Sequence, residues 1–260
     1  MGARGDAAGD VVLCHGTPWS SAVWADVARR LAVDRRVFAY DMPGYGASIG
    51  PDPVDVDLVA QRRRFAAMLD HWGLISPAVV AHDIGGAVAL GAHLLEGAQL
   101  SSLYLLDVVT LDPWGSPFFR LVARHESVFA ALPPQLHAAL VREYISGAAN
   151  GALDARLTAE LAEPWCTRDG QRAFYRQIAS LKPEHTRPIV ESLGRVSCPV
   201  RIAWGELDPW IPAAQAAGLA ERLPGDPGVF TIPSAGHLAP LEATEALAAD
   251  IALWLNRTAG

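Results

Sequence analysis

Six short apolar runs, none of which alternates with polar residues, constrain the fold of this chain more than any other feature. They cover residues 11–15, 36–41, 77–82, 102–107, 199–205 and 228–233. Strands that are apolar on both faces occur in parallel sheets covered by helices on each side. Helical patterns lie between the runs, at residues 20–31, 55–72, 84–96, 212–222 and 240–256. This alternation predicts an α/β fold with a mostly parallel sheet and flanking helices.

One long segment interrupts the alternation. Residues 112–185 contain no strand pattern; they begin with the turn-forming stretch "DPWGSP" and continue as four helical patterns. An insertion between the fourth and fifth strands would lie over the carboxyl ends of the strands, where ligands bind in open α/β sheets. The sequence therefore predicts a core of residues 1–111 and 186–260 with a helical lid at 112–185. The alternative is a helical subdomain that does not cover a ligand site.

The composition argues against several classes of partner. Twenty-one basic residues stand against 28 acidic ones, for a net charge of −7, which makes nucleic acid a poor partner. The three cysteines show no metal-binding spacing and suit a reducing compartment. No apolar run approaches the roughly 20 residues of a membrane span. We expect a cytoplasmic protein with no metal and no membrane partner.

The stretch "VVAHDIGGAVAL", residues 79–90, places a carboxylate where a strand turns into a helix. Asp83 stands at the apex, and the small residues Ala81, Gly85 and Gly86 surround it. Small residues let the strand and helix approach closely, and the turn exposes the apex side chain at the helix N-terminus, as in a nucleophile elbow. The alternative is that Asp83 only caps the helix, since Asp is a preferred N-cap residue.

Three further motifs favour a catalytic role for Asp83. "LCHGTP" (13–18) follows the first strand, Asp208 lies in "WGELDPWIP" (204–212) after the fifth, and His237 lies in "PSAGHLAP" (233–240) after the sixth. Nucleophile, acid and histidine therefore follow one another in chain order, each just past the end of a strand.

The sequence gives less support for a catalytic role of the other polar residues near these motifs. Asp107, at the end of the fourth strand, is the alternative to Asp208 as the acid that orients the histidine. His82 should point to the opposite side of its strand from Asp83, and we expect it to be structural. We expect His15 to brace its turn by hydrogen bonds.

Together the motifs resemble the α/β-hydrolase superfamily from about residue 11 to 257. His82-Asp83-x-Gly85-Gly86 and "DMPGYGAS" (41–48) resemble its aspartate-nucleophile branch of epoxide hydrolases and dehalogenases. The resemblance implies a cofactor-free reaction in which Asp83 forms a covalent alkyl ester. His237 then activates water to hydrolyse that ester, Asp208 orients His237, and the amides of Thr17 and Ile84 hold the oxyanion.

The chain departs from that family at its N-terminal end. The family normally has an antiparallel hairpin before the strand that leads to the "HGxP" turn, but only ten residues precede residue 11 here. We therefore expect a sheet in which this hairpin is missing or truncated, with an exposed edge at residues 36–41. Exposed edges favour pairing with another chain, so a homodimer is one expected consequence.

The leaving group separates the functions within the branch. Haloalkane dehalogenases usually carry Trp directly after the nucleophile and Asn in the "HGNP" turn, where this chain has Ile84 and Thr17. Epoxide hydrolases carry lid tyrosines that protonate the epoxide oxygen, and "RAFYRQI" places Tyr175 in a similar setting, with Tyr144 as a looser second match. The resemblance thus implies an epoxide hydrolase that converts an apolar small molecule to a vicinal diol.

Other functions stay open at this point. Three tryptophans, Trp19, Trp114 and Trp165, are candidates to line the substrate cavity, and they would also suit a halide in a haloalkane dehalogenase. A haloacid dehalogenase should have an arginine pair near the nucleophile, which "GGAVALGAH" lacks. A hydrolase-fold protein that binds a ligand without turnover, and a lyase or cyclase in the same pocket, are the remaining alternatives.

Overall fold

A six-stranded, entirely parallel sheet forms the centre of the computed structural model, which describes residues 9–258. Its strands are β1 (Asp10–Cys14), β2 (Arg36–Ala39), β3 (Ala78–His82), β4 (Ser102–Leu106), β5 (Val200–Gly205) and β6 (Val229–Ile232). They lie in the order β2-β1-β3-β4-β5-β6. All six predicted strands are present, and the predicted fold class is confirmed.

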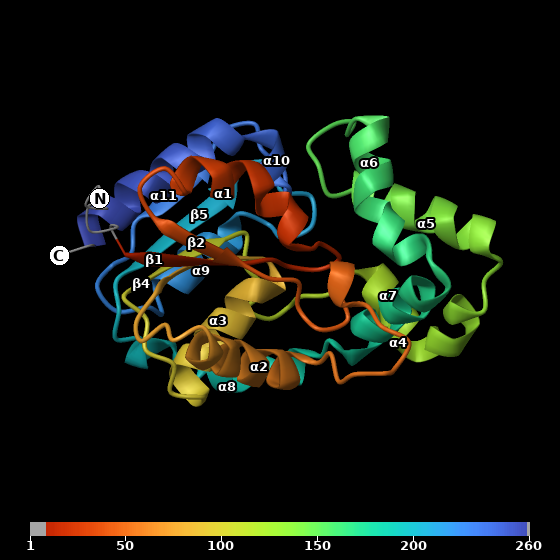
Figure 1. Cartoon of the computed structure of the whole chain (residues 1–260), viewed down its shortest axis with the longest axis horizontal. Helices are drawn as coiled ribbons and strands as arrows, with labels where there is room; N and C mark the ends of the chain where they lie inside the picture. Colours follow the sequence, from red (N-terminus) through yellow and green to blue (C-terminus); the bar gives the residue numbers. More distant parts are fainter. Residues whose placement is uncertain (1–8, 259–260) are drawn as a thin grey trace, which may run out of the picture.

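Helices cover both faces of the sheet (Figure 1). One side carries α1 (Ala25–Leu31), α10 (Ala239–Glu242) and α11 (Thr244–Thr258), and the other carries α2 (Leu58–His71), α3 (Ile84–Leu95) and α8 (Arg187–Val190). The short helix α9 (Ala214–Ala220) contacts β5 and β6. Every residue of β3 and β4 is buried, which explains why these runs show no polar alternation. The single helix predicted at 240–256 is two helices, because the backbone of Ala243 is not helical.

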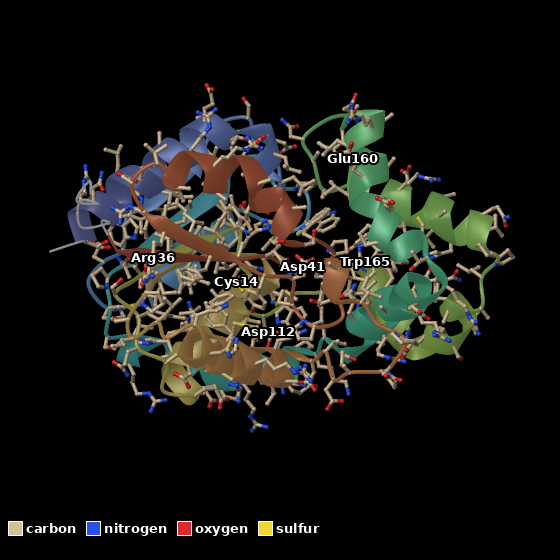
Figure 2. All side chains as sticks on the ribbon, viewed as in Figure 1. Cys14, Arg36, Asp41, Asp112, Glu160 and Trp165 are labelled. Atoms are coloured by element: carbon tan, nitrogen blue, oxygen red, sulfur yellow. The ribbon has the colours of Figure 1, made fainter. Side chains whose placement is uncertain are left out.

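The segment between β4 and β5 contributes four longer helices and no strand. They are α4 (Pro117–Ala130), α5 (Pro134–Ser146), α6 (Ala155–Ala162) and α7 (Arg168–Ser180), and we call residues 117–180 the insertion. The insertion lies beyond the carboxyl ends of the strands (Figure 1). Trp165, labelled in Figure 2, lies where the insertion meets the core, and its indole N–H donates to the Pro18 carbonyl at 2.8 Å. A lid function for this segment stays a prediction.

Strand β2 lies at the outer edge of the sheet. β2 pairs only with β1, and within residues 9–258 no strand lies on its other side. The strand is short and only partly buried, and Arg36 at its start pairs with Asp10.

Within residues 9–258, no helix has both the length and the apolar composition that a membrane crossing requires.

The turn from β3 into α3 packs unusually closely against the first strand. A Cβ atom built on Gly85 would lie 2.5 Å from the His15 carbonyl oxygen and 2.7 Å from that of Cys14. One built on Gly86 would lie 2.3 Å from a methyl carbon of Val108. Because the atoms facing Gly85 are backbone atoms, only glycine lets α3 approach the "HGTP" turn this closely.

We expect Gly85→Ala to lower the free energy of unfolding by about 1–3 kcal/mol, because the backbone must shift to admit the methyl group. Gly194→Ala is the matched control, since a Cβ at that position meets nothing within 4 Å. Chemical denaturation of both variants measures the difference. Equal effects of the two substitutions would contradict the close packing at Gly85.

Candidate active site

Asp83 occupies a strained turn between β3 and α3. Its backbone has φ 53° and ψ −126°, a conformation that costs a residue other than glycine about 1–3 kcal/mol. Hydrogen bonds hold the turn: the Asp83 carbonyl accepts from the amides of Gly86 and Val109, each at 3.0 Å. The side chain makes no capping bond to α3. The capping alternative is therefore wrong, and the carboxylate is free to contact other groups.

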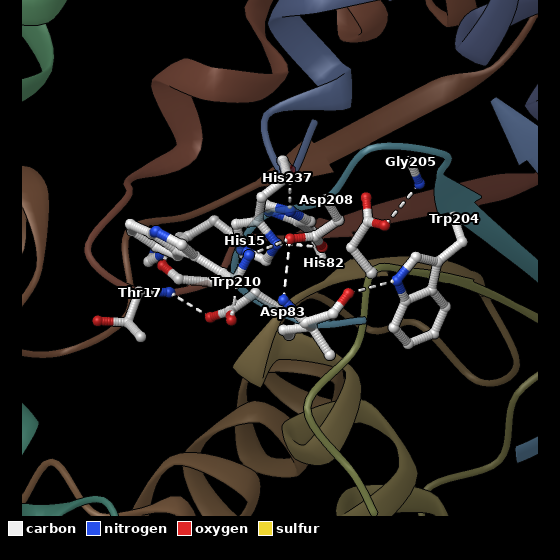
Figure 3. A network of polar contacts seen from close by, with 12 residues as sticks. His15, Thr17, His82, Asp83, Trp204, Gly205, Asp208, Trp210 and His237 are labelled. Atoms are coloured by element: carbon white, nitrogen blue, oxygen red, sulfur yellow. Dashed lines mark hydrogen bonds and ion pairs between the residues drawn. The ribbon is translucent and has the colours of Figure 1, made fainter. Parts of the chain in front are cut away.

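The two carboxylate oxygens of Asp83 meet different partners (Figure 3). Oδ1 accepts a 2.7 Å hydrogen bond from the backbone N–H of Thr17, in the "HGTP" turn. Oδ2 lies 3.5 Å from Nε2 of His237, an ion-pair distance that is long for a hydrogen bond. The residue is only 3% exposed. One oxygen is thus held by an amide while the other faces an imidazole.

Asp208 holds the opposite side of the His237 ring. The His237 Nδ1 and Asp208 Oδ2 atoms are 2.8 Å apart, and both side chains are fully buried. The other Asp208 oxygen accepts from the amides of Trp210 and Ile211, at 2.7 and 2.9 Å. Burial opposes ionisation of Asp208, but the charge and hydrogen bond of His237, together with these amides, lower its pKa. Asp208 is therefore ionised and fixes the ring orientation of His237.

Asp107, the alternative acid, makes no hydrogen bond to His237 among the described residues. One of its oxygens accepts from the Gly205 amide at 2.7 Å, and the other has no hydrogen-bond partner among the described residues. Burial, and then the charge of Asp208, raise the pKa of Asp107 well above its usual value. The hydrogen-bond geometry therefore supports Asp208, not Asp107, as the orienting acid.

The electrostatic surroundings of His237 favour its protonated form. Burial alone would lower the pKa of His237, but the charge and hydrogen bond of Asp208, and then the nearby Asp83 carboxylate, raise it well above the usual value. His82 supports the same loop, with its Nε2 atom 2.9 Å from the His237 carbonyl. Burial and the charge of His237 lower the pKa of His82 to about 3, so His82 stays neutral. Both observations agree with the structural role expected for His82.

His15 also has the bracing position expected for it. Its Nδ1 atom lies 2.8 Å from the Gly16 carbonyl, and its Nε2 atom accepts from the Met42 amide at 2.9 Å. These bonds tie the "HGTP" turn to the loop after β2. Burial lowers the pKa of His15, which keeps the ring neutral.

A cavity of about 290 Å³ opens over Asp83. Aromatic and proline side chains dominate its walls, and within the described part of the chain no lysine or arginine lines it. Its larger lining residues are Trp114, Phe119, Tyr144, Trp210, Pro209 and Pro212. Thr17, Asp83 and Ile84 also line it. The site therefore suits a small uncharged molecule.

The two predicted lid tyrosines have different surroundings. Tyr144 lines the cavity, and its hydroxyl has no hydrogen-bond partner among residues 9–258. Burial, followed by the charge of Asp83, raises the pKa of Tyr144 well above 10, so this phenol keeps its proton. Tyr175 requires a correction: it does not line the cavity, because its hydroxyl lies 2.9 Å from His137 Nδ1 inside the insertion.

Only one of the three tryptophans predicted to line the cavity does so. Trp114 lines the cavity, while its indole N–H donates to the Thr186 hydroxyl at 3.1 Å. Trp19 and Trp165 do not line it: each is about 1% exposed, and both pack where the insertion meets the core. Trp19 stacks instead on Trp210, with ring centroids 5.7 Å apart.

Two neighbours of the site were missed by the sequence reasoning. Trp210 lines the cavity, with its ring 5.0 Å from that of His237 and 4.7 Å from that of Tyr144. Its position two residues after Asp208, in a motif already identified, was a usable signal. Gln177 accepts a hydrogen bond from the Thr17 hydroxyl at 2.7 Å, and no sequence pattern marks it.

Comparison with known proteins agrees with this architecture. Residues 11–250 match the model of a family described as the alpha/beta hydrolase family. The crystal structure of an alpha/beta hydrolase fold protein from Burkholderia ambifaria is 43% identical, covers 94% of this chain and 89% of that chain, and superimposes with a TM-score of 0.89.

Curated relatives differ in their activities. The acetyltransferase component of an acetoin cleaving system from Pseudomonas putida is 25% identical over 97% of this chain, which spans 65% of the length of that protein. A haloalkane dehalogenase from Agrobacterium fabrum is 38% identical over 80 residues, which are 31% of this chain and 26% of that protein.

We expect Asp208→Asn to lower the pKa of His237, because the substitution removes the negative charge bonded to Nδ1. Asp107→Asn is the control: Asp107 is already neutral, and an amide oxygen can keep the bond to Gly205. Imidazole ¹⁵N shifts followed against pH measure both variants. An unchanged His237 pKa in Asp208→Asn, or an equal drop in Asp107→Asn, would contradict the assignment of Asp208.

Proposed function

Since the chain belongs to the alpha/beta hydrolase family, we propose that it is a hydrolase that opens an epoxide through a covalent ester on Asp83 and releases a vicinal diol. The observation that carries this proposal is the pair of contacts at Asp83, an amide on Oδ1 and the His237 imidazole 3.5 Å from Oδ2. A carboxylate is a suitable nucleophile for saturated carbon, and it leaves an ester that water can hydrolyse.

In the first step, Oδ2 of Asp83 bonds to an epoxide carbon and the carbon–oxygen bond of the ring breaks. The Tyr144 phenol, which keeps its proton and faces the cavity, protonates the departing oxygen. Ester formation removes the charge on Asp83 that helps to raise the pKa of His237. His237 therefore releases a proton at this stage. That proton restores the Tyr144 phenol and so replaces the one taken up by the epoxide oxygen.

In the second step, neutral His237 accepts a proton from water at Nε2, and the hydroxide attacks the ester carbonyl carbon. Negative charge develops on Oδ1, which the Thr17 N–H already contacts, with the Ile84 amide as the second donor. The substrate keeps its own carbon–oxygen bond, and the acyl–oxygen bond breaks. The departing alkoxide takes the proton of the added hydroxyl group, which leaves Asp83 as a carboxylate. The diol leaves, and the Asp83 carboxylate and protonated His237 are restored.

The cavity supports a restricted class of substrate. Its volume of about 290 Å³ lies at the lower end of small-molecule sites, and its walls are largely aromatic. The lining has no cationic side chain among the described residues to pair with a carboxylate, which disfavours haloacids. We infer that the substrate is a small uncharged epoxide bearing an apolar or aryl group.

Dehalogenation is the second candidate, because one N–H donor is free in the cavity. Trp210 lines the cavity, and within residues 9–258 its indole N–H has no hydrogen-bond partner, a feature that suits a halide. The relative from Agrobacterium fabrum is a haloalkane dehalogenase. Against this candidate, the other cavity indole, Trp114, already donates to Thr186.

We expect His237→Gln to accumulate the Asp83 ester when incubated with styrene oxide, because the alkylation step needs no base whereas hydrolysis does. Intact-protein mass spectrometry should show a gain equal to the whole mass of the epoxide. Asp83→Asn, the matched control, should show none. If only 1-bromobutane forms an adduct, and that adduct contains no bromine, the result would favour dehalogenation. If neither compound forms an adduct, a ligand-binding protein would be the better description.

We expect Tyr144→Phe to slow alkylation by styrene oxide by about 10²-fold, because the phenol is the proton donor to the epoxide oxygen. Tyr175→Phe should change this rate little, since the Tyr175 hydroxyl is bonded to His137 away from the cavity. Rapid-quench mass spectrometry gives both rates. A larger loss in Tyr175→Phe than in Tyr144→Phe would reverse the two assignments.

A further inference from the structure

Gln177 is a fully buried amide on α7 whose hydrogen bonds leave the insertion. Its Oε1 atom accepts from the Thr17 hydroxyl at 2.7 Å and from the Tyr45 hydroxyl at 3.1 Å. Its Nε2 atom is buried without a hydrogen-bond partner among the described residues. All the hydrogen bonds of this side chain therefore go to the core, beside the oxyanion turn.

Stability alone does not account for this side chain. A buried amide with an unpaired N–H₂ group costs free energy, and an apolar side chain of similar size would fill the same space without that cost. Gln171, on the same helix, behaves as a structural amide, because its N–H₂ group donates to the carbonyls of Ala130 and Leu132 inside the insertion. Gln171 thus links parts of the insertion to each other, whereas Gln177 links the insertion to the core.

Thr17 is held from two directions. Its N–H donates to Asp83 Oδ1 at 2.7 Å, and its hydroxyl donates to Gln177 at 2.7 Å. The following carbonyl, that of Pro18, accepts from the Trp165 indole at 2.8 Å. The insertion therefore holds the Thr17 side chain and the Pro18 carbonyl, both just after the peptide whose N–H points at Asp83.

We propose that Gln177 is a positioning residue that holds the Thr17 amide for the hydrolysis of the Asp83 ester, and that it has little part in ester formation. This inference rests on the proposed function. During alkylation, negative charge leaves the carboxylate, so a donor on Oδ1 does not stabilise that transition state. During hydrolysis, negative charge builds on the same oxygen, so the position of the donor matters most there.

The kinetic test separates the two half-reactions of Gln177→Leu with styrene oxide. We expect alkylation of Asp83 within about twofold of wild type and ester hydrolysis slower by at least about tenfold, part of the 10²–10³-fold that an oxyanion donor contributes. Rapid-quench mass spectrometry should then show more of the alkylated protein in Gln177→Leu than in wild type. Equal slowing of both steps would overturn the proposal.

Matched variants separate positioning from loss of packing. Gln171→Leu removes a buried amide from the same helix and should leave the ratio of the two rates unchanged. Thr17→Val keeps the amide but removes the hydroxyl, and it should reproduce the effect of Gln177→Leu. The double variant should be no slower than either single one, because the two side chains act through one bond. Additive losses would contradict this.

A second measurement needs no substrate. The amide proton of Thr17 bonds to a carboxylate, so its resonance should lie far downfield and should move upfield in Gln177→Leu but not in Gln171→Leu. An unmoved Thr17 resonance in Gln177→Leu would overturn the positioning role. If styrene oxide never alkylates Asp83, the proposed function fails while this measurement still decides the role of Gln177.

Discussion

The position of the Asp83 carboxylate, between the Thr17 amide and the His237 imidazole, is the interaction on which the rest of this structure depends. It exists only because the turn after β3 adopts a strained backbone and because Gly85 lets α3 pack against the carbonyls of residues 14 and 15. The closely packed parallel sheet supplies the rigidity that keeps this strained turn in place.

The charges around His237 form a consistent set. Two carboxylates, Asp83 and Asp208, face the buried ring, while burial raises the pKa of the third buried acid nearby, Asp107, well above its usual value. This leaves one net negative charge, and backbone amides at Thr17, Trp210 and Ile211 partly compensate it. In the proposed reaction, forming an ester on Asp83 would remove that charge, so the same group that attacks the substrate would also control when His237 becomes a base.

The sequence predicted the parts of the site that lie in the core. Asp83, Asp208 and His237 each follow a buried apolar strand, and the carboxyl ends of parallel strands meet at one edge of the sheet. The choice of Asp208 over Asp107 rested on its motif, and the hydrogen bond to His237 agrees with it.

The insertion was less predictable. A helical pattern shows that residues 168–180 form a helix, but the direction of Tyr175 depends on how four helices pack, and the local sequence does not encode that. Tyr144, the looser sequence match, is the phenol that lines the cavity. Gln177 reaches Thr17 across 160 positions of the chain, so only the folded structure reveals the contact.

The most direct measurement of the central claim is a single turnover of styrene oxide, with enzyme in excess, in H₂¹⁸O. If water attacks the ester carbonyl carbon, the diol carries ordinary oxygen and the peptide containing Asp83 gains ¹⁸O. If water attacks the epoxide directly, the diol carries ¹⁸O and Asp83 stays unlabelled, which would contradict a covalent ester on this carboxylate.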